Sequence, residues 1–256
     1  MVVLNPTTTC LTIETSVAAA EWLALDIETG DAPEEAVAVA LETWTPPANV
    51  KDPVKLEARR AEAIQKARER AALLDASPVL CIAAQTERER ISFNGMNNEA
   101  YSIEDWTVVP CGDERGMLIA FRAWADRSAD AGTLLVGHNL RSFDLPKLRA
   151  RYVHYRLRLP KVLTPKLRDE DWNETVDTMT LYKAFSMEHR DERYIALDTV
   201  AAGLGIPRPK EIISGADVPR LHHEGQHHAV LTYCCVDTLT ATRAFQLMTS
   251  CAPDLD

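Results

Sequence analysis

Two carboxylates follow an apolar run near the N-terminus and stand two positions apart. The run covers residues 22–25 (WLAL), and Asp26 and Glu28 come directly after it. Because residues i and i+2 of a strand point to the same face of a sheet, both carboxylates are predicted to face one spot. Two negative charges that close raise each other's pKa, and a divalent cation between them removes the repulsion. The pattern therefore predicts a metal site.

Two later segments carry acidic residues that could complete this site. Asp144 follows the apolar segment 133–137 (TLLVG) and stands near a predicted helix start, where free backbone N–H groups favour an ionised carboxylate. Tyr233 and Asp237 are four positions apart in a predicted helix, so they share one face. An Asp inside an apolar helix is costly without a partner, and a metal ion would be that partner. Taken singly, Asp144 also fits a plain N-cap, and Asp237 fits an exposed position.

The elements that position these groups are predicted from periodicity and from helix-ending residues. Strands are expected at about 21–27, 78–86, 90–94 and 133–137, and a short strand is expected to end at Val176. Helices are expected at 51–74, 114–130, 145–152, 177–185, 195–204 and 226–249. This order predicts an N-terminal extension at 1–20 and one α/β domain at 21–250, with a central mixed β-sheet flanked by helices. The segment at about 43–75 separates two strands that a short hairpin could join, so it is interpreted as a helical insertion after the first strand.

The composition is that of an ordinary globular protein, with 46% hydrophobic and 26% charged residues among 256. No apolar stretch reaches membrane-spanning length, and the N-terminus lacks the basic region and apolar core of a signal peptide. The six cysteines include no C-x-x-C pair, which favours reduced thiols over a zinc site. We therefore expect a cytoplasmic protein without a membrane segment.

The net charge of −10 argues against a protein that coats nucleic acid electrostatically. Residues 145–168, however, contain eight basic residues and no acidic one, with two tyrosines interleaved. This stretch fits a phosphate-binding surface and a solvated helix face equally well. Basic residues in the insertion are a weaker candidate, because acidic residues alternate with them: Lys51, Lys55, Arg59 and Arg60.

Residues 222–228 (HHEGQHH) are rich in metal-binding side chains. They do not form an H-E-x-x-H motif, because no His follows Glu224 at the required offset and Gly225 interrupts the helix. The cluster favours a polar loop before the last helix. A generic metallohydrolase that uses this second metal site is a distant alternative.

The order of the acidic motifs resembles that of a known enzyme family. A strand with D-x-E, a strand followed by H-N-x(3)-F-D and a helix, and a helical Y-x(3)-D resemble the three motifs of the DEDD (DnaQ-like) 3′→5′ exonucleases. The tyrosine matches the DEDDy branch, whereas Thr232 stands where the DEDDh branch would need a histidine. Flanking segments are similar to the predicted exonucleases related to family-B DNA polymerase proofreading domains: 176–179, 197–200, 203–207 and 210–218. The similarity runs from about 21 to 248 and implies a ribonuclease H-like fold with two Mg²⁺ or Mn²⁺ ions.

The resemblance also implies roles for individual residues. The four metal-binding carboxylates would be Asp26, Glu28, Asp144 and Asp237. Tyr233 would orient the attacking water, and Thr29 would contact the terminal nucleotide. The second motif supplies His138 and Asn139, which are expected to support the site without binding metal. The other candidates for substrate binding are Arg141, Phe143, Lys147 and Lys210.

The chemistry expected of these groups is two-metal-ion hydrolysis of a phosphodiester. Two cations about 4 Å apart stabilise the attacking and leaving oxygens together, and hard cations prefer carboxylate oxygens. Tyr233 would be a poor general base at neutral pH, because a tyrosine has an ordinary pKa near 10. The sequence thus predicts a 3′→5′ exonuclease that acts on single-stranded DNA or frayed 3′ ends. An exoribonuclease of the same fold and a non-catalytic nucleic-acid-binding module are the alternatives.

Overall fold

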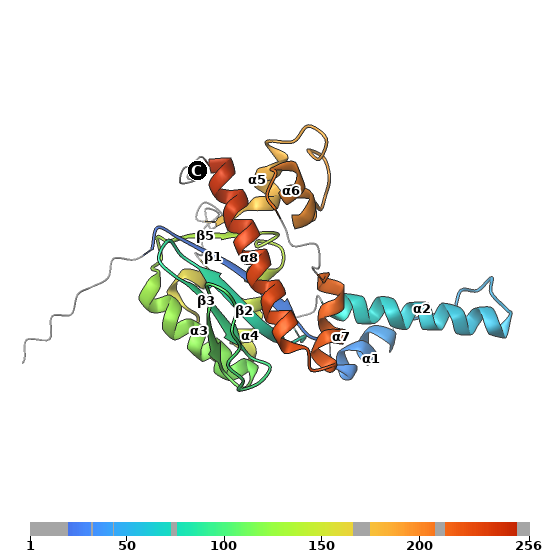
Figure 1. The fold of residues 1–256 in the computed structure, drawn as a ribbon. Helices are drawn as coiled ribbons and strands as arrows, with labels where there is room; N and C mark the ends of the chain where they lie inside the picture. The colour runs from blue at the N-terminus through green and yellow to red at the C-terminus, as the bar shows by residue number, and fades with distance from the viewer. Residues whose placement is uncertain are drawn as a thin grey trace, which may run out of the picture.

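The fold is known from a computed structural model, which describes residues 20–31, 33–42, 44–72, 76–165, 175–207 and 213–249. The strands are β1 (Trp22–Thr29), β2 (Val79–Gln85), β3 (Arg90–Asn94), β4 (Thr107–Pro110), β5 (Leu134–Gly137) and β6 (Thr175–Asp177). The helices are α1 (Glu34–Glu42), α2 (Pro53–Ala72), α3 (Glu114–Ser128), α4 (Asp144–His154), α5 (Thr178–Lys183), α6 (Leu197–Gly203), α7 (Val218–His223) and α8 (His227–Thr249). Short 3-10 helices lie at Lys161–Leu163 and Gly215–Asp217. Figure 1 shows their arrangement.

The strands form one six-stranded mixed sheet in the order β4-β3-β2-β1-β5-β6. β1 is antiparallel to β2 and parallel to β5, so it lies inside the sheet and not at an edge. Because β1 and β5 are parallel, their carboxyl ends meet at the same end of the sheet. The last residues of β1 carry the first acidic motif and the segment after β5 carries the second, so the sheet brings these two motifs together.

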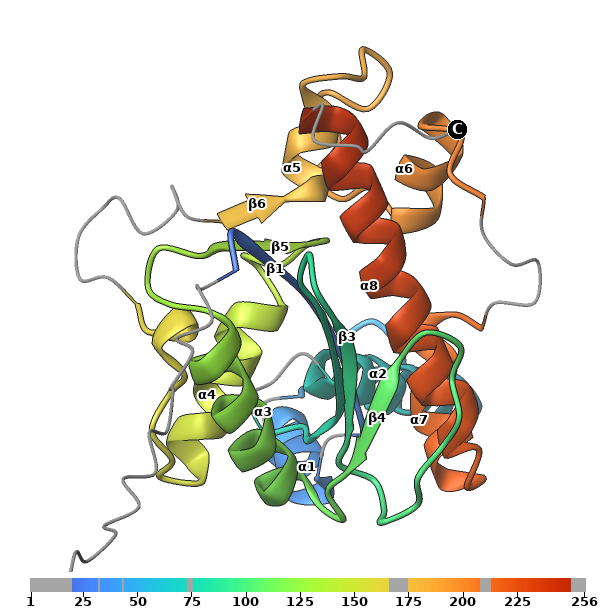
Figure 2. The same cartoon turned by 60° about the vertical axis from the view of Figure 1, so that its left-hand side comes forward.

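Helices cover both faces of the sheet (Figure 2). Leu23, Leu25 and Ile27 of β1 point into a core shared with α3 and α4. The alternate residues of β1 face α8, where Ala24 packs against Phe245. This alternation is the period of two that a strand imposes, and it places Asp26 and Glu28 on the α8 face. The sheet and its covering helices confirm the predicted α/β class.

A helical arm leaves the sheet between β1 and β2. It contains α1 and α2, and Figure 1 shows α2 projecting away from the sheet. The two ends of the arm are hydrogen-bonded neighbours, because Thr29 pairs with Val79 and the Gly30 N–H donates to the Pro78 carbonyl at 2.9 Å. The expected helix at 51–74 is thus present as α2. The additional helix α1 begins before the predicted insertion boundary at 43.

Three elements in the described part of the chain were not expected from the sequence: α1, β4 and α7. β4 is a four-residue edge strand that ends in Pro110, which suits an edge because proline has no N–H to donate. α7 corrects the prediction of a polar loop at 222–228, because His223 ends α7 and His227 begins α8. Only a short turn separates these two helices. No helix in the described ranges is long and apolar enough to cross a membrane.

Candidate active site

Asp26 and Glu28 lie at the carboxyl end of β1 and face α8. Glu28 is only 7% exposed, and Asp26 is half-buried. The buried Oδ2 atom of Asp26 has no hydrogen-bond partner among the residues that the structure describes. The β1–β2 register shifts between Glu28 and Thr29, so the strand is irregular where the carboxylates end. An unsatisfied buried carboxylate oxygen is unfavourable unless a ligand or ion binds it.

Asp144 reaches the same place from α4. It is the first residue of that helix and is 2% exposed, whereas Phe143 occupies the N-cap position and makes no side-chain cap. The Asp144 carboxylate instead accepts a hydrogen bond from the Ile27 N–H at 3.2 Å, between the two acidic residues of β1. Asp144 is therefore directed at β1 and is not a plain N-cap.

α8 supplies the remaining acidic residue and the tyrosine. Asp237 is buried, and its carboxylate lies one turn from Tyr233, where it helps burial to raise the pKa of the tyrosine hydroxyl. Between them, the Cys234 thiol donates to the Asp26 carbonyl at 3.4 Å, which holds this turn of α8 against β1. The four-residue spacing thus places Tyr233 and Asp237 on the side of α8 that faces β1.

Burial and mutual repulsion raise the pKa of three of these carboxyls, those of Asp26, Glu28 and Asp144. Desolvation is the main cause at Asp26, and the neighbouring Asp144 and Asp237 charges add to it. Glu28 behaves in the same way, with Asp26 as its strongest charged neighbour. The pKa of Asp144 rises to about 8, mainly through desolvation. Four acidic groups in one buried place repel each other when ionised, so the site favours a cation.

The donor set fits a hard divalent cation. Single ligand atoms of Asp26, Glu28 and Cys234 all lie within 4.8 Å of one another, and no other such group of three occurs among the described residues. Carboxylate oxygens suit Mg²⁺ or Mn²⁺, whereas burial raises the pKa of the Cys234 thiol and keeps it protonated. Asp144 and Asp237 border this group. Residues 222–228 do not form a comparable cluster in the described part of the chain.

His138 and Asn139 stabilise the loop between β5 and α4, which leads to Asp144. The His138 ring hydrogen-bonds to the Thr178 hydroxyl at 3.1 Å and to the Ile195 carbonyl at 2.8 Å. Asn139 adopts a left-handed conformation (φ 56°), and its N–H donates to Asp177 at 3.0 Å. Neither side chain is in the group of possible metal ligands. These contacts suit a supporting role, which stays a prediction.

Asp177 is a site residue that sequence reasoning missed. Its buried carboxylate accepts hydrogen bonds from the N–H groups of Asn139, Arg141 and Met179. It thereby fixes the loop between β5 and α4, and its charge contributes to the raised pKa of Asp144. The only signal in the sequence is its place in the flanking segment 176–179.

Tyr194 is a second missed residue. It is 60% exposed and lies edge-on to the His138 ring at a centroid distance of 6.5 Å. Partial burial raises its pKa, and the nearby charges of Asp237, Asp198 and Asp26 add to this effect. An exposed aromatic ring beside the carboxylates offers a surface on which a base can stack. No motif in the sequence marks this position.

Two predicted substrate contacts are turned inward. Lys147 is 3% exposed, and its ammonium donates to the Ser77 carbonyl at 3.3 Å. The Arg141 guanidinium donates to the hydroxyl and the carbonyl of Thr175 at 2.7 and 2.5 Å. Both cations are bonded to the protein backbone, which argues against their predicted contact with phosphates. They are better interpreted as residues that hold elements together.

Two of the three remaining predicted contacts, Thr29 and Phe143, directly adjoin acidic residues of the candidate site in the sequence. Thr29 is half-buried at the end of β1, next to Glu28. Phe143 is half-buried and packs against the core under α4. Lys210 lies outside the described residues.

The basic stretch 145–168 is divided between interior and surface. Arg151 forms a buried ion pair with Glu114 at 2.6 Å, and Arg149 donates to the Leu163 carbonyl at 2.8 Å. Three basic side chains are exposed: Arg156, Arg158 and Lys161. Lys166 and Arg168 lie outside the described residues. The stretch is thus not a single phosphate-binding surface.

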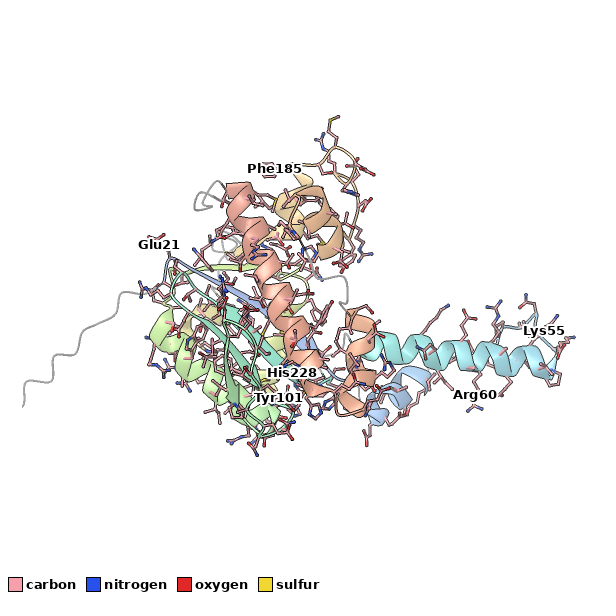
Figure 3. All side chains as sticks on the ribbon, viewed as in Figure 1. Glu21, Lys55, Arg60, Tyr101, Phe185 and His228 are labelled. Carbon is pink, nitrogen blue, oxygen red and sulfur yellow. The ribbon has the colours of Figure 1, made fainter. Side chains whose placement is uncertain are left out.

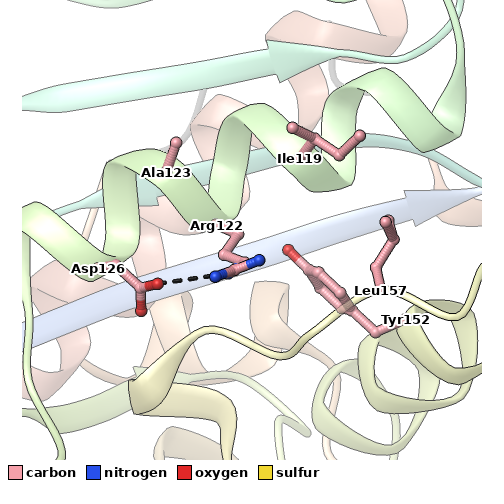
Figure 4. A pocket seen from close by; sticks show the side chains of 6 residues that line it. All are labelled: Ile119, Arg122, Ala123, Asp126, Tyr152 and Leu157. Carbon is pink, nitrogen blue, oxygen red and sulfur yellow. Dashed lines mark hydrogen bonds and ion pairs between the residues drawn. The ribbon is translucent and has the colours of Figure 1, made fainter.

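A hollow on the opposite side of the sheet is separate from the carboxylates. It has a volume of about 280 Å³ and lies between α3 and the end of α4 (Figure 4). Its lining residues are Ile119, Arg122, Ala123, Asp126, Tyr152 and Leu157. Arg122 and Asp126 form an ion pair at 3.4 Å along α3, on one side of the hollow. The hollow contains none of the acidic residues of the candidate site.

Comparison with known proteins identifies the family. A sequence model described as a predicted 3'-5' exonuclease related to the exonuclease domain of PolB matches residues 83–251, which is about two thirds of the chain. The match includes Asp144, Tyr233 and Asp237, whereas β1 with its two carboxylates lies before it, on the other side of the arm. A comparison with curated proteins finds no match. The chain belongs to this family of predicted 3'-5' exonucleases, which are phosphodiester hydrolases, and its mixed sheet flanked by helices is consistent with their ribonuclease H-like fold.

Proposed function

We propose that this exonuclease removes nucleotides one at a time from the 3′ end of DNA, with a preference for single strands and frayed ends. Asp26, Glu28, Asp144 and Asp237 would hold two divalent cations, either Mg²⁺ or Mn²⁺. The observation that supports this proposal best is the convergence of these carboxylates from β1, α4 and α8 around the unsatisfied Oδ2 atom of Asp26. Bound there, the cations would stabilise charge on the attacking and leaving oxygens of the phosphodiester.

Tyr233 orients the attacking water in this proposal, as in the DEDDy branch. Burial and the nearby carboxylates raise the pKa of Tyr233 well above its usual value near 10. The hydroxyl therefore stays protonated at neutral pH and cannot act as the general base. It can hydrogen-bond to a water while Asp237 fixes its direction.

The preference for single strands is supported by the exposed aromatic ring beside the carboxylates. A 3′-terminal base that leaves a duplex loses its stacking partner, and Tyr194 could replace it. Thr29 would contact the terminal nucleotide. An exoribonuclease would use the same groups, so RNA remains the second candidate substrate. The cytoplasmic location expected from the sequence stays a prediction.

The test is stepwise cleavage of 5′-labelled oligonucleotides. We expect a ladder that shortens from the 3′ end with Mg²⁺ or Mn²⁺, faster on single-stranded than on double-stranded DNA, and lost with EDTA or in Asp26→Asn. Asp113→Asn, in the N-cap of α3, is the matched carboxylate control. Faster cleavage of single-stranded RNA would favour the exoribonuclease. Binding of DNA without cleavage in either metal would favour the non-catalytic module.

A further inference from the structure

The described side chains of the arm helix α2, residues 53–66, are exposed on nearly every side. Between residues 53 and 66 only Leu56, Ala63 and Ile64 are even half-buried. Figure 3 shows Lys55 and Arg60 extending from the arm, away from the sheet. A helix of 20 residues is about 30 Å long, and one that is polar all round does not bury a face against its own domain. The arm thus presents a long polar surface to solvent.

The charge of α2 is opposite to that of the rest of the chain. Its sequence contains six basic and three acidic residues, a net charge of +3 in a protein of net charge −10. The rest of the sequence therefore has a net charge of −13. A basic helix projecting from an acidic protein offers a local attraction for a polyanion that the whole molecule does not.

The acidic residue in the middle of α2 is already neutralised. Glu62 pairs with Arg59 at 2.9 Å and with Lys66 at 2.7 Å, so two cations share one carboxylate. Lys55 and Arg60 have no ion-pair partner among the described residues. Positive charge consequently remains along this helix after the internal pairs are counted.

The base of the arm lies at the rim of the candidate active site. α1 begins five residues after Thr29, which adjoins the carboxylates of β1. Asp31, between β1 and α1, pairs with His223 of α7 at 2.7 Å. α7 in turn packs in the same apolar cluster as the part of α8 that carries Tyr233. A strand that enters the site can therefore pass near the arm.

We propose that α2 binds the sugar-phosphate backbone of the substrate strand on the 5′ side of the nucleotides held at the carboxylates. This inference rests on the proposed function, because it assigns the arm to the same substrate. At the 3.4 Å rise per nucleotide of a stacked strand, a helix of about 30 Å spans at most roughly nine nucleotides. A long strand engages the arm, whereas a trinucleotide fills only the site.

The experiment compares two double charge reversals. Lys55→Glu with Arg60→Glu changes the arm and keeps its helix propensity. Arg115→Glu with Arg127→Glu makes the same charge change on α3, where both residues are exposed and lie on the opposite face of the sheet. The value of kcat/KM is measured for each protein on a single-stranded DNA of three nucleotides and on one of 25, at low and moderate salt.

We expect the arm variant to lose about tenfold in kcat/KM on the long strand and to keep its kcat/KM on the trinucleotide. Because two phosphate contacts are lost, the dependence of log(kcat/KM) on log salt concentration for the long strand should be less steep by about 1.4. The α3 variant should match the wild type on both. Equal losses in the two variants, an equal loss on both lengths, or no loss would overturn the inference. The inference would also be overturned if the arm variant changed its oligomeric mass but showed no loss of kcat/KM that depends on strand length, because the arm would then contact protein.

Binding of the 25-nucleotide strand, measured by fluorescence anisotropy in Ca²⁺, separates the two proposals. A wild type that cleaves neither substrate overturns the proposed function. The arm is then still tested, because weaker binding by the arm variant than by the α3 variant supports it, and equal binding overturns it.

Discussion

Removal of the Tyr233 hydroxyl alone should slow phosphodiester cleavage strongly. Tyr233→Phe keeps the aromatic ring and removes only the hydroxyl that would align the attacking water. We expect single-turnover cleavage to slow by about 100-fold, since loss of one aligned donor commonly costs that much, while Mn²⁺ and DNA affinities stay the same. An unchanged cleavage rate would contradict the water-orienting role.

Tyr194 should affect substrate binding more than chemistry. Stacking of one base on an aromatic ring contributes about 1–3 kcal/mol, so Tyr194→Ala should raise KM for single-stranded DNA by about tenfold and leave kcat nearly unchanged. Tyr194→Phe keeps the ring and should behave like the wild type. Steady-state kinetics on one oligonucleotide give both values. Equal KM values for the Ala and Phe variants would exclude stacking.

The residues that sequence reasoning located best are those whose spacing is tied to secondary structure. The two-residue spacing of Asp26 and Glu28 and the four-residue spacing of Tyr233 and Asp237 each fix a shared face. The inward direction of Lys147 and Arg151 could not be predicted, because composition does not say where a long basic side chain points. Both are drawn inward by acceptors far away in the sequence, Ser77 and Glu114.

At the scale of elements, the buried pair Glu114–Arg151 connects α3, α4 and the start of β2. Glu114 accepts from the Val79 N–H at 2.8 Å, and Arg151 donates to the Ala76 carbonyl at 3.2 Å. Removing one partner leaves the other charge buried, so Glu114→Gln should lower the free energy of unfolding by about 3–5 kcal/mol. Urea unfolding measures this loss. Glu114→Gln combined with Arg151→Met should recover part of it, whereas a purely additive loss would exclude the pairing.

The elements that sequence reasoning found are those with a complete apolar pattern. β2 and α8 carry long buried runs, and their bounds agree with the predictions within one or two residues. The missed elements carry weaker patterns. α1 alternates alanine and valine, which is typical of neither a strand nor an amphipathic helix, and β4 has four residues. β4 is defined by its pairing with β3, which four residues of sequence do not reveal.

For the whole molecule, the crowded carboxyls predict a stability that falls as the pH rises in the absence of metal. A carboxyl with a raised folded-state pKa binds its proton more tightly in the native than in the unfolded state. Its stabilising contribution is complete below the unfolded pKa near 4 and is lost as the pH rises through the folded pKa, about 8 for Asp144. We expect Tm in EDTA to drop by several degrees between pH 5 and pH 8.

Divalent metal should reverse this loss. At pH 8, Mn²⁺ at 100 times its Kd stabilises the folded state by about 2.7 kcal/mol, or roughly 5–10 °C in Tm. Asp144→Asn should flatten the pH dependence in EDTA and reduce the response to Mn²⁺. Calorimetry of both proteins at several pH values provides the comparison. A wild-type Tm in EDTA that rises between pH 5 and pH 8 would contradict the raised pKa values.

The hydrogen bond between Gly30 and Pro78 has a consequence for how this enzyme could diversify. The chain leaves the sheet and returns to it at adjacent points, so the strands on either side are aligned as they would be around a tight hairpin turn. The sheet consequently places little constraint on what lies between these two points. Lengthening, shortening or replacing the arm should therefore leave the carboxylates of the candidate site in their positions.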